Sequence, residues 1–368
     1  MRGAALVKRA ATHRRRWPAM GACALIGMAC GGVTPPAERV AAPAPATAGA
    51  APPGAPAVVS ARDRAAAPGE QQTPPSLAPS APLPRLAADA SGAAPPGTVP
   101  EACGPFECWR FDLGERALSA VLAEEPLAIG IGEAHALAGS EAVASTARRF
   151  ASALLPSLAG RASHLVVELL NPDPRCASTT REVRKRQEPV TAPQSTQNQN
   201  DYVALGQRAR ALGIEPFVLS PSCDEFRAIA GAGDAAIDVM LQTIARVTSR
   251  MLRGALAKNQ SAGRPALVIG YGGALHNDIE PAEAKASWSY GPELATFTRG
   301  RYVELDLIVR EFIKDTDVWR ALPWYEHFDP NRFEGEWLVM RTAPHRYVLF
   351  FPRDRSATSV PAEPPSTP

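Results

Sequence analysis

Two histidines and two glutamates stand at the ends of apolar runs in this 368-residue sequence. Glu133 and His135 follow the run PLAIGIGE, Glu168 lies in HLVVELL, and His276 ends RPALVIGYGGALH. Such groups activate water in two ways. Without a metal, a histidine flanked by carboxylates acts as a general base. With one, His135, Glu168 and His276 would hold a divalent ion, Mn²⁺ or Zn²⁺, that generates hydroxide. Both chemistries predict a hydrolase acting on an acyl ester or peptide bond, and the sequence does not choose between them.

These residues need a sheet whose strands end at a common edge. Compact apolar runs predict strands, and apolar residues at helical spacing predict helices between them, the first capped by Ser140. The predicted strands are 126–133, 164–170, 214–220, 264–276 and 301–309, and the predicted helices are 140–158, 201–213 and 234–258. The alternation predicts an α/β fold, with a mainly parallel sheet flanked by helices on both faces. Residues 336–352 predict a C-terminal antiparallel hairpin at one edge.

In open α/β sheets the ligand crevice lies beyond the carboxyl ends of the strands. Glu133, His135, Glu168 and His276 all fall at such ends, so we expect them to converge on one rim. Residues 171–200 are polar and show no clear period. A loop of that length is expected to cover the crevice as a lid.

The N-terminal third reads as an export and tethering segment. Residues 1–30 combine a basic start with a short apolar stretch ending in GMACGG, which predicts a signal peptide with Cys30 as a lipidation site. A plain secretory peptide is the alternative. Residues 31–100 are rich in Ala and Pro and predict a disordered tether, residues 101–353 the α/β domain, and residues 354–368 a disordered tail. The expected location is the outer membrane or the periplasmic face, with the lipid as the membrane contact.

Cysteine use is consistent with an oxidising compartment. Cys103 and Cys108 bracket a Gly-Pro turn, and Cys176 and Cys223 each follow a predicted strand, so two disulfides are expected. Four free thiols are the alternative.

Charge gives no reason to expect a nucleic-acid partner. The net charge is only +2, and the basic run REVRKRQE at 181–188 alternates with acids, which favours a solvated face. The partners expected are therefore a small-molecule or peptide substrate and the membrane.

The paired motifs GEAH (132–135) and GALH (273–276), with Glu168 between them, resemble the superfamily of erythromycin esterases, ChaN-like haem-binding lipoproteins, and TraB and Tiki proteins. The resemblance covers roughly residues 127–306. It implies that Glu133, His135, Glu168 and His276 form a catalytic or metal-binding set. The esterases carry Thr before the histidine and Gly after it, where Ala134 and Ala136 stand here.

The resemblance also implies a competing class of protein. ChaN-like members are associated with haem, whose iron takes His or Tyr as axial ligand. Tyr271, His276 or Tyr290 would serve in that role. A third interpretation is a catalytically silent surface domain, in which the four rim residues point into separate regions.

Overall fold

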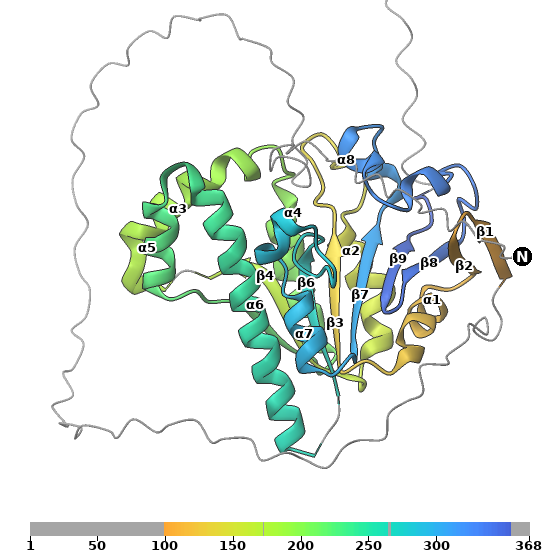
Figure 1. Cartoon of the computed structure of the whole chain (residues 1–368), viewed down its shortest axis with the longest axis horizontal. Coiled ribbons are helices and arrows are strands. Elements are labelled where there is room, and N and C mark those ends of the chain that lie inside the picture. Colours follow the sequence, from red (N-terminus) through yellow and green to blue (C-terminus); the bar gives the residue numbers. More distant parts are fainter. Residues whose placement is uncertain (1–98, 172, 264–265, 355–368) are drawn as a thin grey trace, which may run out of the picture. The chain divides into compact units, whose positions relative to one another are not determined.

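The computed structural model of the chain describes residues 99–171, 173–263 and 266–354 (Figure 1). The predicted signal peptide with Cys30, nearly all of the predicted tether and all of the tail but its first residue lie outside the described residues.

Nine strands form one mixed, mostly parallel sheet in the order β1-β2-β8-β9-β7-β3-β6-β4-β5. The strands are β1 (Val99–Cys103), β2 (Phe106–Phe111), β3 (Ala128–Glu133), β4 (Ala162–Leu170), β5 (Glu215–Leu219), β6 (Leu267–Gly273), β7 (Tyr302–Ile308), β8 (Trp337–Ala343) and β9 (Arg346–Phe350). The run from β9 to β5 is parallel, whereas β1, β2, β8 and β9 pair in antiparallel fashion. The predicted α/β fold and all five predicted strands are therefore confirmed.

The predicted C-terminal hairpin forms as β8 and β9, but it does not lie at the edge of the sheet. Strand β2 pairs with β8, and β1 pairs with β2 to form the edge. Gly104 makes the turn between β1 and β2, with φ of +61°. This turn was recognised in the sequence only as a disulfide loop, because the strands that flank it are short.

Helices connect the strands and pack against them. The α-helices are α1 (Gly114–Val121), α2 (Thr146–Arg149), α3 (Ala177–Thr191), α4 (Gln197–Ala211), α5 (Cys223–Gly231), α6 (Ala236–Ser261), α7 (Gly291–Phe297) and α8 (Asp317–Arg320). Short 3₁₀ segments are η1 (Leu122–Glu124), η3 (Leu155–Leu158), η4 (Pro174–Cys176), η5 (Gly233–Ala235), η6 (Glu283–Trp288), η7 (Arg310–Phe312) and η8 (Tyr325–His327), and η2 (Phe150–Leu154) is a π-helical turn.

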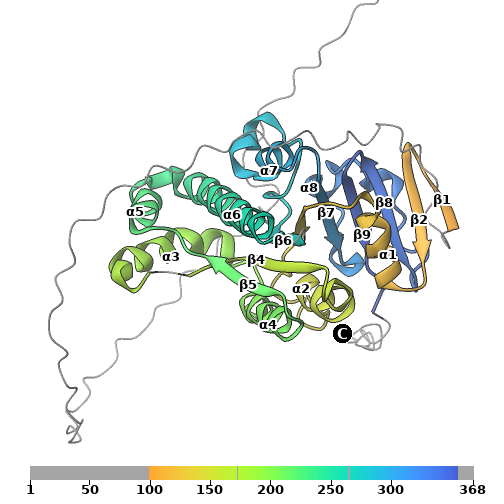
Figure 2. The same cartoon turned by 90° about the horizontal axis from the view of Figure 1, so that it is seen from below.

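Alternate residues of the central strands enter different apolar clusters, as the two-residue period of a strand requires. Ile129 and Ile131 belong to a cluster with α4, whereas Ala128 belongs to a cluster with α6. Figure 2 shows α4 and α6 on opposite sides of β4. Helix α4 packs against β4 and β5, and α6 packs against β4 and β6.

The helix after β3 begins later than predicted. Ser140 does not cap it, since its hydroxyl donates to the carbonyl oxygen of Leu137 at 2.6 Å. Ser145 is the N-cap and accepts a hydrogen bond from the backbone N–H of Arg148 at 3.1 Å. The residues between the two serines form turns and bends, so Ser140 lies too far before the helix that begins at Thr146 to cap it.

The predicted lid loop is largely helical. Helix α3 occupies Ala177–Thr191, and α4 begins at Gln197. The basic run 181–188 therefore lies on a helix, where Arg181 and Lys185 are exposed. Helix α3 could not be predicted from an apolar period because only a few of its residues are buried, namely Thr180, Val183 and Val190.

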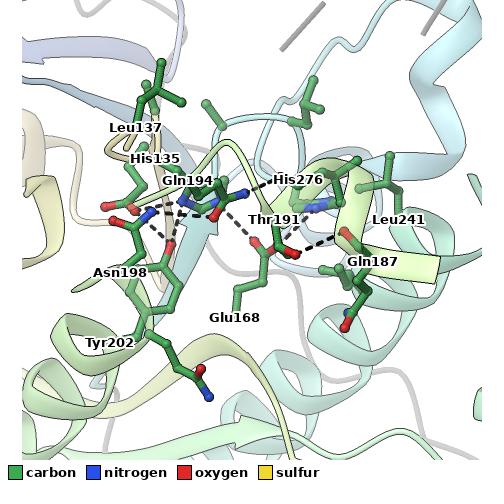
Figure 3. A pocket seen from close by; sticks show the side chains of 18 of the residues that line it. His135, Leu137, Glu168, Gln187, Thr191, Gln194, Asn198, Tyr202, Leu241 and His276 are labelled. Carbon is green, nitrogen blue, oxygen red and sulfur yellow. Dashed lines mark hydrogen bonds and ion pairs between the residues drawn. The ribbon is translucent and has the colours of Figure 1, made fainter. Parts of the chain in front are cut away.

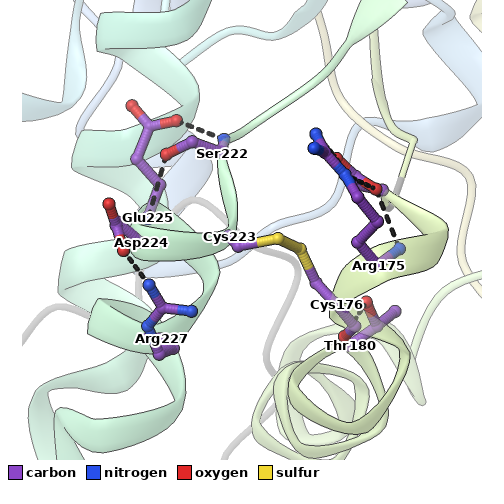
Figure 4. The surroundings of a disulfide bond; sticks show 9 residues. Arg175, Cys176, Thr180, Ser222, Cys223, Asp224, Glu225 and Arg227 are labelled. Atoms are coloured by element: carbon purple, nitrogen blue, oxygen red, sulfur yellow. Dashed lines mark hydrogen bonds and ion pairs between the residues drawn. A yellow bond between two sulfur atoms is a disulfide. The ribbon is translucent and has the colours of Figure 1, made fainter. Parts of the chain in front are cut away.

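Both predicted disulfides are present. Cys103 is joined to Cys108 across the β1–β2 turn, with Cα atoms 6.2 Å apart. Cys176 is joined to Cys223, with Cα atoms 5.6 Å apart, and links the start of α3 to the start of α5 (Figure 4).

Candidate active site

Glu133, the last residue of β3, holds a buried carboxylate with three hydrogen-bond donors. Only 4% of the residue is exposed. Oε1 accepts from the Tyr202 hydroxyl at 2.9 Å and faces His135 Nδ1 at 3.0 Å, and Oε2 accepts from the Tyr271 hydroxyl. Both tyrosine hydroxyls are committed to this carboxylate. The three partners hold it in one orientation behind His135.

His135 presents a free ring nitrogen to solvent-accessible space. Because the Glu133 carboxylate only accepts hydrogen bonds, Nδ1 carries the proton and Nε2 is the acceptor in the neutral ring. The side chain is 23% exposed. Burial by itself would lower the pKa of His135, but the hydrogen bond and charge of Glu133 and the charge of Glu168 raise it above its ordinary value. A histidine held in this way is suited to accept a proton from water.

Asn198 fixes the segment that follows His135. Its side-chain N–H donates to the carbonyl oxygen of Ala136 at 2.9 Å. Asn198 and Tyr202 lie one turn apart on α4, so a single helix positions both the histidine's backbone and its carboxylate partner.

Glu168 lies near the end of β4, where the pairing with β5 becomes irregular beyond Val167. Its Oε2 accepts from the backbone N–H of Gly273 at 2.7 Å. A Cβ at the neighbouring Gly272 would lie 2.1 Å from that same oxygen. The glycine is therefore required for the carboxylate to approach β6 so closely.

His276 is buried and forms an ion pair with Glu168. Nδ1 donates to the carbonyl oxygen of Trp288 at 2.6 Å, and Nε2 lies 3.5 Å from Glu168 Oε1. Since Nδ1 already carries a proton, Nε2 donates to Glu168 only in the imidazolium form. Although burial opposes both charges, the pKa of His276 is raised by Glu168, and the pKa of Glu168 is lowered mainly by His276.

These groups line a cavity of about 790 Å³ at the carboxyl ends of the parallel strands. Figure 3 shows His135, Asn198 and Tyr202 on one side and Glu168 and His276 on the other. Helix α3 adds Gln187 and Thr191 to the lining, so the segment predicted to cover the crevice does border it. The predicted set Glu133, His135, Glu168 and His276 is thus brought together at one site, and the separate orientations expected of a silent domain are not observed.

The metal interpretation fits this geometry poorly. Within the described ranges, the one group of three or more His, Cys, Asp or Glu ligand atoms lying within 4.8 Å of one another is Asp173, Cys176 and Cys223. The two sulfurs of that group are bonded to each other, so they offer no thiolates. His135, Glu168 and His276 do not form such a group, and His276 Nε2 is directed at Glu168.

The two tyrosines named as haem ligands, Tyr271 and Tyr290, do not lie on the cavity wall. Tyr271 is 2% exposed, donates to Glu133 and stacks on Phe150. Burial, followed by the charge of Glu133, raises its pKa well above its usual range, which disfavours the phenolate that iron would bind. Tyr290 is also buried, and neither tyrosine lines the cavity. The third candidate, His276, does line it, but its Nε2 is paired with Glu168. A haemin titration without a saturable Soret shift would remove this alternative.

Tyr202, Asn198 and Asp306 were not identified from the sequence. Asp306 on β7 pairs in register with Gly132 and lines the cavity. Burial raises the pKa of Asp306 to about 6, partly offset by a hydrogen bond from Asn277. The alternation of apolar and acidic residues within RYVELDLIV could have indicated Asp306. Its carboxylate lies near the end of a parallel strand, at the same edge of the sheet as the other site residues. No comparable signal marked Tyr202 or Asn198.

No family model, no curated protein and no solved structure matches this chain. In the part of the chain that the structure describes, no helix is both long enough and apolar enough to cross a membrane.

Proposed function

We propose that this chain is an exported lipoprotein whose folded body is a metal-independent hydrolase of acyl ester or peptide bonds. The observation that carries the proposal is the state of His135: Nδ1 is held by Glu133 while Nε2 faces the cavity. An imidazole that is oriented by a carboxylate at one nitrogen and open at the other can accept a proton from water as a general base.

The proposed reaction begins with proton transfer from water to His135 Nε2. The water oxygen attacks the acyl carbon, and the bond from that carbon to the leaving oxygen or nitrogen then breaks. His135 returns its proton to the leaving group, which yields a carboxylic acid and an alcohol or amine. Glu133 and Glu168 stabilise the positive charge that His135 carries between the two transfers, because both already raise its pKa.

The resemblance to the erythromycin esterase, ChaN-like, TraB and Tiki superfamily supports the same conclusion. It rests on the two Gly-x-x-His motifs and on Glu168. In the structure the glycines before each histidine lie in paired strands, since Gly132 is in register with Gly272 and Glu133 with Gly273.

The proposal is tested with panels of chromogenic esters and peptides. Activity should persist after EDTA treatment and disappear in His135→Ala. The control is His327→Ala, which removes an imidazole from a turn that does not line the cavity. Loss of activity with EDTA and its return with Mn²⁺ or Zn²⁺ would replace the metal-free mechanism by the metal-dependent one.

Export and lipidation rest on the sequence of residues 1–30. Cys30→Ser should leave the protein unacylated and move it from the membrane fraction to the soluble fraction. Persistent membrane association would place the anchor elsewhere.

A further inference from the structure

The cavity has two apolar walls that belong to different parts of the fold. The first wall comes from α3, α5 and α6, on the β4 side of the sheet. Its apolar residues are Val183, Val190, Phe226, Met240, Leu241 and Ile244. All six are buried, and all except Leu241 belong to the apolar cluster of α6. This first wall is a continuation of the protein core.

The second wall comes from the last residue of β7 and the segment that follows it. Its apolar residues are Ile308, Phe312, Val318, Trp319, Leu322 and Trp324. Four of them, Ile308, Trp319, Leu322 and Trp324, pack in a separate cluster with β8 and β9. This second wall therefore lies on the far side of β7 from α6.

The catalytic groups stand between the two walls. His135 follows β3, Glu168 lies near the end of β4 and His276 follows β6. Strands β3 and β6 lie between β4 and β7. The lining also carries four other charged side chains, Arg184, Asp306, Glu311 and Lys314, and polar side chains from α3 and α4. Arg184 and Lys314 are exposed, and Glu311 is paired with Arg149 at 3.0 Å.

We infer that the substrate is an uncharged ester with an apolar group on each side of the scissile bond, one against each wall. The inference rests on the proposed hydrolase function and deepens it. A peptide would place backbone N–H and C=O groups against the apolar side chains of the two walls, and burying them there without hydrogen bonds is costly. Alkyl groups would instead be removed from water on both sides of the attacked carbon.

The test uses two series of linear esters. In one, the acyl chain is lengthened while the alcohol stays ethyl; in the other, the alcohol is lengthened while the acid stays acetic. Acid release is followed by titration. Burial of each methylene is expected to raise kcat/KM by about fourfold until a wall is filled. The increase should appear in both series, and an increase in one series or in neither would overturn the inference while leaving the hydrolase proposal intact.

Two variants assign the walls. Leu241→Asn changes the first wall and Trp319→Gln the second, and each should flatten the length dependence of one series while preserving the other. Each variant is thus the control for its counterpart. Equal flattening of both series by either variant would show a single shared surface and would overturn the two-wall assignment.

A second measurement separates this inference from the proposed function. Dialkyl ketones resemble the esters but cannot be hydrolysed, so their binding to the full chain is measured by calorimetry. Affinity that rises with both alkyl chains supports the inference even if no ester is hydrolysed. A folded protein that binds none of these ketones contradicts it.

Discussion

The two histidines of the cavity share one feature and differ in another. In both, Nδ1 is tied to an acceptor, which is the Glu133 carboxylate for His135 and the Trp288 carbonyl for His276. Nε2 of His135 faces the cavity, whereas Nε2 of His276 faces Glu168 and the residue is only 3% exposed. The same ring is therefore set up as a base in one place and as the partner of a carboxylate in the other. What surrounds Nε2, and not the motif, decides the role.

The largest effect expected from this comparison is on turnover. His135→Ala removes the base and Glu168→Gln removes a charge that stabilises it, so each should lower kcat by about a hundredfold or more. Circular dichroism and thermal unfolding should change little for His135→Ala, because the ring is partly exposed. A His135→Ala protein of full activity would show that the base is another group.

The next effect is on stability and concerns His276. His276→Ala leaves Glu168 buried without its cation, and breaking a buried ion pair costs about 3–5 kcal/mol. Urea unfolding should therefore show a larger loss for His276→Ala than for His135→Ala. Metal content should not change, whereas lost metal together with lost activity would restore the metal interpretation. Equal stability losses would contradict the different roles of the two rings.

The pH dependence should separate the two rings. Activity needs neutral His135, so kcat/KM should fall as the pH drops through a pKa raised above about 6.5. The stability that His276 contributes depends on pH in the opposite direction to the activity. Because its folded pKa is raised, its contribution is complete below the unfolded value and is lost as the pH rises through the folded value. Glu168, whose folded pKa is lowered, loses its contribution only as the pH falls through that lower value.

Rates and urea midpoints measured on the same buffers between about pH 5 and about pH 9 check this prediction. Activity should rise with pH, while the part of the stability that depends on His276 declines. His276→Ala should remove this part of the decline, whereas the part that depends on His135, whose folded pKa is also raised, should remain. A stability profile unchanged in that variant would mean that another group titrates.

The smallest effect is expected at Tyr202. Tyr202→Phe removes one of the three donors to Glu133 and should lower kcat by about tenfold, as for a hydrogen bond to a charged group. Tyr347→Phe is the matched control, since its hydroxyl donates to Glu124 away from the cavity. Equal rates for the two variants would show that Tyr202 does not help to position His135.

The strand ends were predictable because strand and helix periods are local. Glu133, His135, Glu168 and His276 each follow or end an apolar run, and parallel strands carry such positions to one edge. Tyr271 shows the limit of that reasoning. Tyr271 lies near the end of β6, yet its side chain stacks on Phe150 in the core. The register of β6 with β3 decides which face of the sheet it occupies.

Tyr202 and α3 required tertiary information. The direction of Tyr202 depends on how α4 is rotated against β4, which a largely polar helix does not specify. Helix α3 is polar apart from a few positions, and it is positioned by contacts with α5 and by the Cys176–Cys223 disulfide. The place of the β1–β2 hairpin in the sheet likewise follows from pairing with β8, far away in the chain.

The Cys176–Cys223 disulfide implies that the cavity of the enzyme proposed here is completed after the rest of the chain has been made. It joins the starts of α3 and α5, which supply Val183, Val190 and Phe226 to the first wall. Newly made chains in a reducing cytoplasm hold separate thiols, so α3 is then attached by packing alone. The reduced protein should hydrolyse long-chain esters more slowly than the oxidised one. Under the proposed export, this disulfide would form, and the first wall would be completed, only after the chain has left the cytoplasm.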